Sequence, residues 1–293
     1  MRKNQTELYS MIIPSAILFL IFCYIPMSGL VLAFRRYDIV GGLYGASWVG
    51  FKYFIQFFND PYFFRIIRNT VLLNLYMLLV AFPAPIIFAL MLNELKSRKF
   101  KRLTQSISYI PHFLSTVIIV GLMMELLLSK GVVNQVLQKL DIEPILFFQE
   151  ATWFRSLYVG SSVWEGIGWS SIIYVAALAG INPELYEHAS IEGAGRFQMI
   201  RYITIPCLMP TIAILFILAV GRLMSVGFKK VFLMYNPATY ETADVISTYI
   251  YRRGIISMDY SYGIAVGLFN SIINFMLLML ANYGARKAGY GLW

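Results

Sequence analysis

The chain has 293 residues, of which 59% are hydrophobic and 13% are charged, and its mean hydropathy is +0.67. Soluble domains carry about 25% charged residues, so this composition excludes an ordinary water-soluble enzyme as well as a disordered chain. The net charge of +9 indicates contact with anionic lipid head groups, and we expect no nucleic-acid partner.

Long stretches without charged residues predict a polytopic membrane protein of the all-α class. A bilayer core about 30 Å thick takes roughly 20 helical residues to cross, so we expect six transmembrane helices. In chain order they cover residues 10–34, 69–93, 104–128, 155–180, 203–228 and 262–285. Together they form a single transmembrane domain that occupies residues 1–293.

The first two predicted helices have features of their own. The first is too long for the apolar core of a cleaved signal peptide and lacks a small-residue cleavage site, so we expect it to anchor the chain. The second contains Pro83 and Pro85. Because proline cannot donate a backbone hydrogen bond, this pair predicts a kink.

Basic residues beside the predicted helices indicate their orientation. Six helices place both termini on one side. If that side is the cytoplasm, basic residues are about twice as dense in the inner segments as in the outer ones, and the cluster at 96–102 lies inside. We therefore predict a multi-pass protein of the cytoplasmic (inner) membrane with cytoplasmic N- and C-termini. The outer segments are basic too, which favours either head-group contact or attraction of an acidic sugar or an acidic binding protein.

The segment between the fourth and fifth predicted helices, 182–202, is expected to form a helix, a glycine elbow and a second helix. Asn182 and Pro183 are typical of a helix start. Gly193 and Gly195 predict the end of that helix, and the next helix begins near Arg196. The small side chains in this loop suit docking into a groove on a cytoplasmic partner; the alternative is an ordinary connecting loop.

The same segment resembles the EAA loop of permease subunits in binding-protein-dependent ABC importers. The positions that follow the family pattern are Glu187, Ala189, Gly193, Ala194, Phe197, Ile203, Pro206 and Pro210. Two positions depart from it, because His188 replaces an alanine and Glu192 replaces an aspartate. The resemblance implies the type I ABC importer permease fold. It also implies that coupling to an ATPase is carried by Glu187, Ala189, Glu192, Gly193, Ala194, Phe197 and Pro206.

The resemblance covers the whole chain. Within the family, the chain is similar to the carbohydrate branch, in particular to the first permease of maltose- and alginate-type systems. The segments that carry it include 24–27, 48–50, 236–238, 243–246 and 291–293. It implies a heterodimer with a second homologous permease, two ATPase subunits, an extracytoplasmic solute-binding protein and an oligosaccharide substrate, including acidic sugars of the uronate or alginate kind.

The chain has no phosphate-cradling G-x-x-x-x-G-K-[ST] loop. We therefore expect a non-catalytic subunit with no catalytic residue, metal or cofactor of its own. The resemblance implies that ATP and Mg are bound by the partner ATPase subunits.

Polar residues inside membrane helices are costly and are candidates for the substrate pathway. These candidates are Asn74, Trp164, Glu165, Trp169, Arg222, Asn270 and Asn274. Sugar sites combine aromatic platforms with planar polar groups, so Trp164, Glu165 and Trp169 form the favoured group. Alternatively, these side chains only hold helices together, with Glu165 paired to Arg222.

Other functions weighed against these residues are a permease for amino acids or peptides, which shares the loop motif, and a secondary transporter. A secondary transporter is typically built from inverted repeats with paired broken helices, and the sequence has no such halves.

Overall fold

The computed structural model describes residues 2–38, 42 and 46–291, which are mostly helical. Leu292 and Trp293, which contribute to the resemblance above, lie outside the described residues. The chain divides into two compact units, which are described separately: residues 1–63 with 249–271, and residues 64–248 with 272–293.

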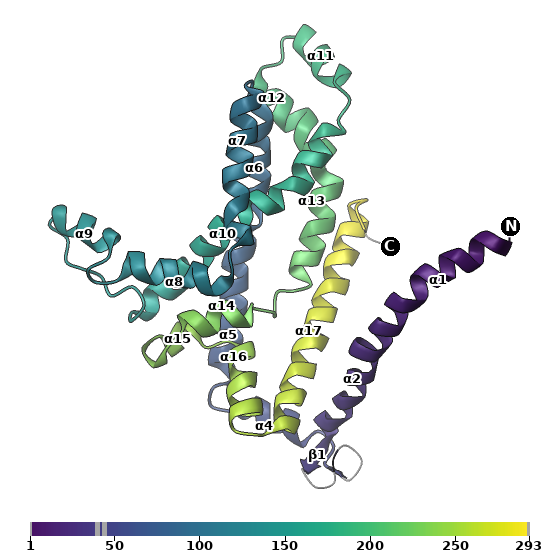
Figure 1. Ribbon diagram of the computed structural model, residues 1–293, viewed down its shortest axis with the longest axis vertical. Helices are drawn as coiled ribbons and strands as arrows, with labels where there is room; N and C mark the ends of the chain where they lie inside the picture. Colours follow the sequence, from purple (N-terminus) through teal and green to yellow (C-terminus); the bar gives the residue numbers. More distant parts are fainter. Residues whose placement is uncertain (1, 39–41, 43–45, 292–293) are drawn as a thin grey trace. The chain divides into compact units, whose positions relative to one another are not determined.

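The first unit combines a long N-terminal helical run with a hairpin and the start of the last helix (Figure 1). Its elements, with η for 3-10 or π turns, are α1 (Arg2–Phe19), η1 (Leu20–Tyr24), α2 (Ile25–Met27), η2 (Ser28–Phe34), β1 (Arg35–Asp38), β2 (Ala46–Trp48), α4 (Lys52–Phe58), η7 (Tyr251–Ile256) and the first part of α17 (Tyr260–Lys287). The two strands pair antiparallel, with Arg35 opposite Trp48.

An aromatic and carboxylate cluster forms the core of the first unit. Phe57 of α4 is 1% exposed and packs against Tyr249, Tyr262 and Phe269. The hydroxyls of both tyrosines donate hydrogen bonds to Asp60. Burial raises the pKa of Tyr249, so its hydroxyl stays protonated and remains a donor. The cluster therefore ties α4 to the start of α17.

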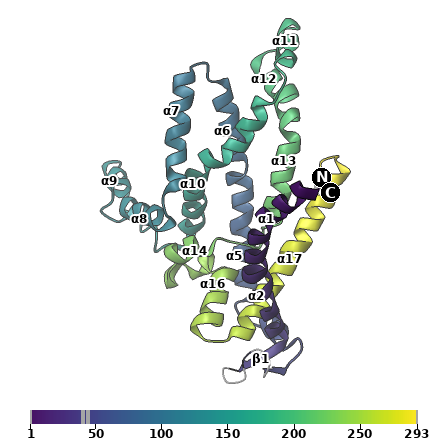
Figure 2. The ribbon, with the colours of Figure 1, turned by 45° about the vertical axis from the view of Figure 1, so that its right-hand side comes forward.

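The second unit is a helical bundle. Its elements are α5 (Phe63–Tyr76, after its first residue), η3 (Met77–Ala81), α6 (Pro83–Glu94), α7 (Arg98–Tyr109), η4 (Ile110–Phe113), α8 (Thr116–Leu127), α9 (Val132–Lys139), α10 (Ala151–Ala179), α11 (Glu184–Ile191), α12 (Arg196–Met199), η5 (Ile200–Thr204), α13 (Ile205–Val220), α14 (Phe228–Met234), η6 (Pro237–Thr239), α15 (Tyr240–Ala243), α16 (Ile246–Ile250, in part) and the end of α17. Figure 2 shows α6 and α7 as an antiparallel pair joined by a short loop.

Five helical runs within the described residues are long and apolar enough to cross a membrane: Tyr9–Phe34, Phe63–Glu94, Thr116–Lys139, Arg196–Val220 and Tyr260–Lys287. The helix α10 belongs to a sixth candidate: α10 and α11 together are long and apolar enough to cross a membrane, but they are bent by 71° at the break between them. This agrees with the predicted six-helix, all-α class.

The third predicted helix, 104–128, needs a correction because it is not continuous. The helix α7 ends at Tyr109, and the chain passes through a 3-10 turn that contains Pro111. A new helix begins after Ser115, whose side chain caps it by accepting from the Ile118 amide at 3.3 Å. Pro111 lacks the amide hydrogen that a continuous helix needs there, so the apolar run bends. The fifth helix also ends early, at Val220 and not near 228.

The second helix is irregular at the predicted place. A π turn, η3, immediately precedes α6, which begins at Pro83. The proline ring clashes with the carbonyl one turn earlier, and the wider π turn accommodates it. The irregularity expected from Pro83 and Pro85 is therefore a π turn. It lies within one helical run, Phe63–Glu94.

The helix α10 organises the second unit through contacts with α6, α7, α13, α14 and α15. It approaches α7 closely at Gly168, where an added Cβ atom would lie 2.2 Å from the Ser108 carbonyl oxygen. Small residues permit this kind of close helix approach in membranes.

We expect Gly168→Ala to destabilise the protein by about 1–3 kcal/mol, because the α7 backbone must move away. Gly160→Ala on the same helix is the matched control, since no atom lies within 4 Å of its added Cβ. Thermal unfolding of the two variants in detergent compares them directly. Equal unfolding temperatures would contradict the close approach.

Candidate functional site

The loop 182–202 begins with a capped helix. The Asn182 side-chain oxygen accepts a hydrogen bond from the Glu184 amide at 3.1 Å, and Pro183 stands at the entry of α11. Glu184 and Glu187 lie in the first turn of this helix, where negative charge is favoured by the helix dipole. The helix therefore starts one residue later than predicted, because Pro183 and not Asn182 is the N-cap.

Gly193 ends α11 in a two-bond cap. The Ala194 amide donates to the Ala189 carbonyl at 2.9 Å, and the Gly193 amide donates to the Ser190 carbonyl at 3.1 Å. This is the hydrogen-bond pattern of a Schellman motif, which needs a left-handed residue at its centre. Gly193 supplies it with φ of +81°. The backbone therefore reverses at Gly193, and α11 points away from the helix that follows.

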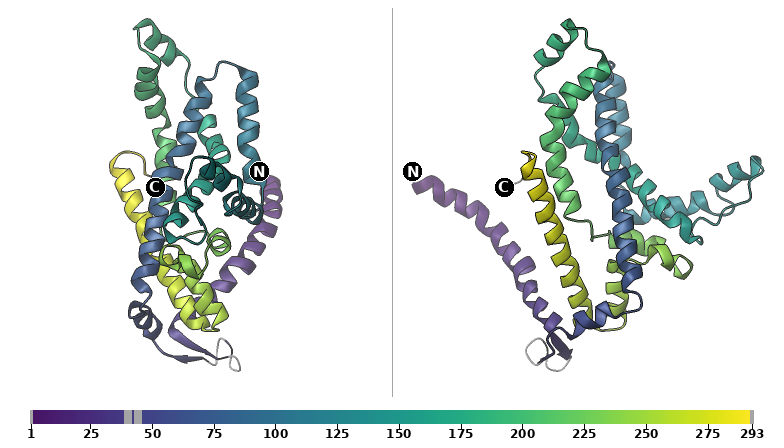
Figure 3. Two further views of the ribbon diagram at one scale, coloured as in Figure 1. Left: turned by 90° about the vertical axis from the view of Figure 1, so that its left-hand side faces the viewer. Right: turned by 180° about the vertical axis from the view of Figure 1, so that it is seen from behind.

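The second half of the loop is fixed to the fifth helix. The Gly195 amide donates to the Gln198 side-chain oxygen at 2.8 Å, and the chain continues from α12 through η5 into α13. The hydroxyls of Tyr186 and Thr204 lie 2.9 Å apart in a hydrogen bond. This bond joins α11 to the base of α13, so the loop is a connected unit. Figure 3 shows it at one end of α13.

The loop exposes both apolar and acidic side chains. Ile191 is 85% exposed and Phe197 is 78% exposed. The predicted coupling residues Glu187, Glu192, Gly193, Phe197 and Pro206 are exposed, while Ala189 and Ala194 are half-buried. Ala189, Glu192, Gly193 and Ala194 line a cavity of about 470 Å³. Such exposed apolar side chains around a concave surface are typical of an interaction site.

Three of the predicted pathway residues line one groove between α5, α6, α10 and α13. A cavity of about 650 Å³ is lined by Trp169 and Arg222, and an adjoining one of about 440 Å³ by Asn74 and Arg222. Ala81, Phe82, Ser170 and Ala219 line both. Arg222 is exposed, and within the described part of the chain its guanidinium has no hydrogen-bond or ion-pair partner. The groove thus combines an aromatic face, an amide and an unpaired positive charge.

The favoured group of Trp164, Glu165 and Trp169 does not form one surface. Five residues along a helix turn the side chain by about 140°, so the two tryptophans face different ways. Trp164 lines a separate cavity of about 520 Å³ together with Glu125, whereas Trp169 stacks on His112 with ring centroids 4.5 Å apart. The grouping is therefore corrected, and only Trp169 lies in the groove.

Glu165 pairs with Lys230 and not with Arg222. The carboxylate and the ammonium nitrogen of Lys230 are 2.9 Å apart. Lys230 also donates to the Ser162 hydroxyl at 3.0 Å and is 7% exposed. The pair joins α14 to α10. Glu165 thus holds a segment between the fifth and sixth helices in place.

The two asparagines of α17 have different surroundings. The Asn274 side-chain oxygen accepts from the Met224 amide at 2.9 Å, and its nitrogen donates to the Ser225 hydroxyl at 2.8 Å. Asn274 therefore fixes the turn after α13. The side-chain oxygen of Asn270, which lies in the first unit, is buried and has no partner among the described residues.

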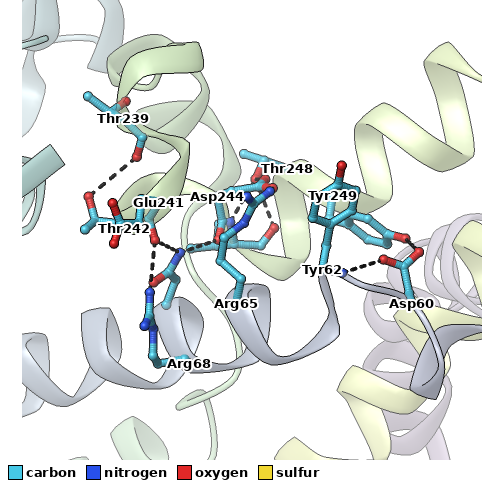
Figure 4. A network of polar contacts seen from close by, with 12 residues as sticks. Asp60, Tyr62, Arg65, Arg68, Thr239, Glu241, Thr242, Asp244, Thr248 and Tyr249 are labelled. Carbon is cyan, nitrogen blue, oxygen red and sulfur yellow. Dashed lines mark hydrogen bonds and ion pairs between the residues drawn. The ribbon is translucent and has the colours of Figure 1, made fainter.

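A polar network around Asp244 anchors the segment before α16 (Figure 4). Asp244 is 0% exposed and pairs with Arg65 at 3.3 Å. Its other carboxylate oxygen accepts from Thr248 at 3.0 Å. Asn69 donates to the carbonyls of Glu241 and Asp244 at 2.8 and 3.1 Å. These contacts hold α5 against the residues 241–248.

Comparison with known proteins decides the family. Residues 81–287 match the family described as binding-protein-dependent transport system inner membrane component. The chain belongs to this family. The permease is 42% identical, over 98% of its length and 89% of the relative's, to the polygalacturonan/rhamnogalacturonan transport system permease protein YteP of Bacillus subtilis.

Two solved structures are similar to the permease throughout. One is a bacterial ABC transporter involved in the import of the acidic polysaccharide alginate, with a TM-score of 0.90 and 43% identity over 97% of this chain and 96% of that one. The other is a bacterial alginate ABC transporter in complex with an alginate pentasaccharide-bound periplasmic protein, with a TM-score of 0.91 and 42% identity over 99% and 97% of the two chains. The permease is therefore a multi-pass membrane subunit of an ABC importer, as the loop motif implied.

Sequence reasoning missed two groups of residues in the permease. Lys230 was not recognised as the partner of Glu165, although a lysine in the apolar stretch 228–234 is a signal of a buried charge. The basic outer segments are expected either to contact head groups or to attract an acidic sugar or an acidic binding protein. Three of their arginines also hold the fold: Arg65 pairs with Asp244, Arg68 donates to the Glu241 carbonyl at 3.3 Å, and Arg155 donates to the Asn69 side-chain oxygen at 3.1 Å. In these contacts Arg65 meets a carboxylate, whereas Arg68 and Arg155 meet neutral oxygens.

Proposed function

We propose that this permease forms one half of the translocation pathway of an ATP-driven importer for acidic oligosaccharides. The observation that carries the proposal is the groove in which Arg222 stands exposed and unpaired beside Trp169 and Asn74. A uronate residue offers a carboxylate for a guanidinium, a ring face for an indole and hydroxyls for an amide. The similar proteins are transporters of polygalacturonan and rhamnogalacturonan and of alginate, which supports the same class of substrate.

The proposal includes the partners of the complex. The permease pairs with a second, homologous permease. Each permease binds one of two ATPase subunits, and the ATPase subunits bind ATP and Mg. The loop 182–202 docks on its ATPase through Ile191, Phe197 and the cavity beside Gly193. A solute-binding protein delivers the sugar from outside, and both termini of the permease face the cytoplasm. The periplasmic protein bound to the similar alginate transporter supports this arrangement.

Arg222→Gln tests the substrate class. We expect about a tenfold loss of kcat/KM for an oligogalacturonate, because a hydrogen bond to a charged group is lost, and no loss for a neutral oligosaccharide of the same length. The measurement is uptake into proteoliposomes that contain the co-purified complex and its binding protein.

Two control variants complete the test. Arg222→Lys keeps the charge and should retain most of the preference for the acidic sugar. Lys229→Gln removes an exposed charge outside the groove and should change neither rate. Equal losses for the acidic and neutral sugars in Arg222→Gln would contradict recognition of the carboxylate.

A further inference from the structure

A cluster of cations at the start of α7 forms no ion pair with any residue that the structure describes. Its members are Lys96, Arg98, Lys99, Lys101 and Arg102. All are exposed except Lys101, which is half-buried. Among the residues that the structure describes, none of the five forms an ion pair, and Glu94 is the one acidic residue of 94–102. The cluster is therefore open to an anion from outside the chain.

An apolar stripe continues from this cluster along α7. Phe100, Leu103, Ile107 and Ile110 are 56–59% exposed. Their spacing of three and four residues places them on one face of the helix. A different face of α7, which carries Ser108, packs closely on Gly168 of α10. The stripe is thus held outward by the packing behind it.

We propose that this surface, named here the α7 lipid surface and made of the five cations and the four stripe residues, binds an anionic phospholipid. The cations contact the phosphate, and the acyl chains lie along the stripe. Charge complementarity selects an anion. At about 100° per residue, Lys99 lies beside the stripe, whereas Arg98, Lys101 and Arg102 lie on the other faces of α7. Cations around one end of an apolar helix face suit a molecule with a charged head and a hydrocarbon tail. The surface accordingly distinguishes anionic from zwitterionic lipid.

The surface lies at the coupling end of the second unit. Figure 2 shows α7 beginning at the same end of that unit at which α11 lies. A bound lipid there steadies the α6–α7 turn, which consists of the short connection 95–97 and is capped by the Ser97 side chain. The anionic lipid content of the membrane therefore sets how firmly this end of the permease is held.

The test uses the full chain with its co-purifying subunits in nanodiscs of phosphatidylcholine, with and without phosphatidylglycerol. Native mass spectrometry counts the phosphatidylglycerol retained. We expect the triple variant K96Q/R98Q/K99Q to bind it at least about fivefold more weakly than the wild type, because each basic residue near an anionic surface contributes on that order. The stripe variant L103Q/I107Q should also release it, although every cation remains.

The matched control is K52Q/K130Q/K139Q, which removes three exposed cations elsewhere and should bind phosphatidylglycerol as the wild type does. Equal retention by the wild type and K96Q/R98Q/K99Q would overturn the proposal. So would a triple variant that keeps the lipid but loses the ATPase subunits, since the cations would then bind an acidic protein surface.

Discussion

Replacing Gly193 with valine should abolish the stimulation of ATP hydrolysis by the sugar-loaded binding protein. Gly193 has φ of +81°, a conformation that costs ordinary L residues about 1–2 kcal/mol and β-branched residues more. No neighbouring atom lies within 4 Å of an added Cβ, so the loss comes from the backbone and not from a clash. The two hydrogen bonds that close α11 are lost, and Ile191 no longer points in its native direction.

The same substitution two residues later is the control. Gly195 has φ of −73° and ψ of 162°, an extended conformation that valine adopts readily. In the Gly195→Val complex, the sugar-loaded binding protein should therefore still stimulate ATP hydrolysis. Gly193→Asn should retain partial activity, because asparagine tolerates the left-handed region. The measurement is ATPase activity and uptake of the reconstituted complex. A fully stimulated Gly193→Val complex would show that the elbow does not transmit the signal.

Glu165→Leu should destabilise the permease strongly, by about 3 kcal/mol, because it leaves the Lys230 ammonium buried without its partner. Lys230 is 7% exposed, and its remaining hydrogen bond is to the Ser162 hydroxyl. Thermal unfolding followed by size-exclusion chromatography measures the loss. A single variant as stable as the wild type would contradict the role of the pair.

The double variant E165L/K230M separates structure from substrate binding. Removing both charges leaves an apolar contact and should restore most of the stability. If Glu165 acts only through α14, uptake should recover with stability. Stable protein that still fails to transport would instead place Glu165 in the sugar pathway, contrary to the observed pairing.

Features governed by local rules could be predicted from the sequence. The membrane helices follow from charge-free runs, because lipid does not solvate charges or unpaired backbone groups. The end of α11 follows from Gly193, because few other residues adopt its backbone conformation. The break at Pro111 is equally local, because proline lacks the amide hydrogen that a continuous helix needs, although the predicted helix 104–128 runs through it.

Contacts between distant residues could not be predicted. Glu165 and Lys230 are 65 positions apart, and the polar residues of membrane helices alone do not specify which pairs meet. The tryptophans near Glu165 are close in sequence, yet the turn of the helix separates them, and His112 from another helix decides where Trp169 packs. The groove around Arg222 likewise depends on where α5, α10 and α13 meet.

The bond between Tyr186 and Thr204 has a mechanical consequence. It fastens α11 to one end of a helix whose other end leads directly to Arg222. The sixteen residues of α13 span about 24 Å at 1.5 Å per residue, so one continuous helix connects the loop to the groove around Arg222. A tilt of about 7° about its base would move the far end of α13 sideways by about 3 Å, the length of a hydrogen bond, which under the proposed function is enough to release a carboxylate from Arg222.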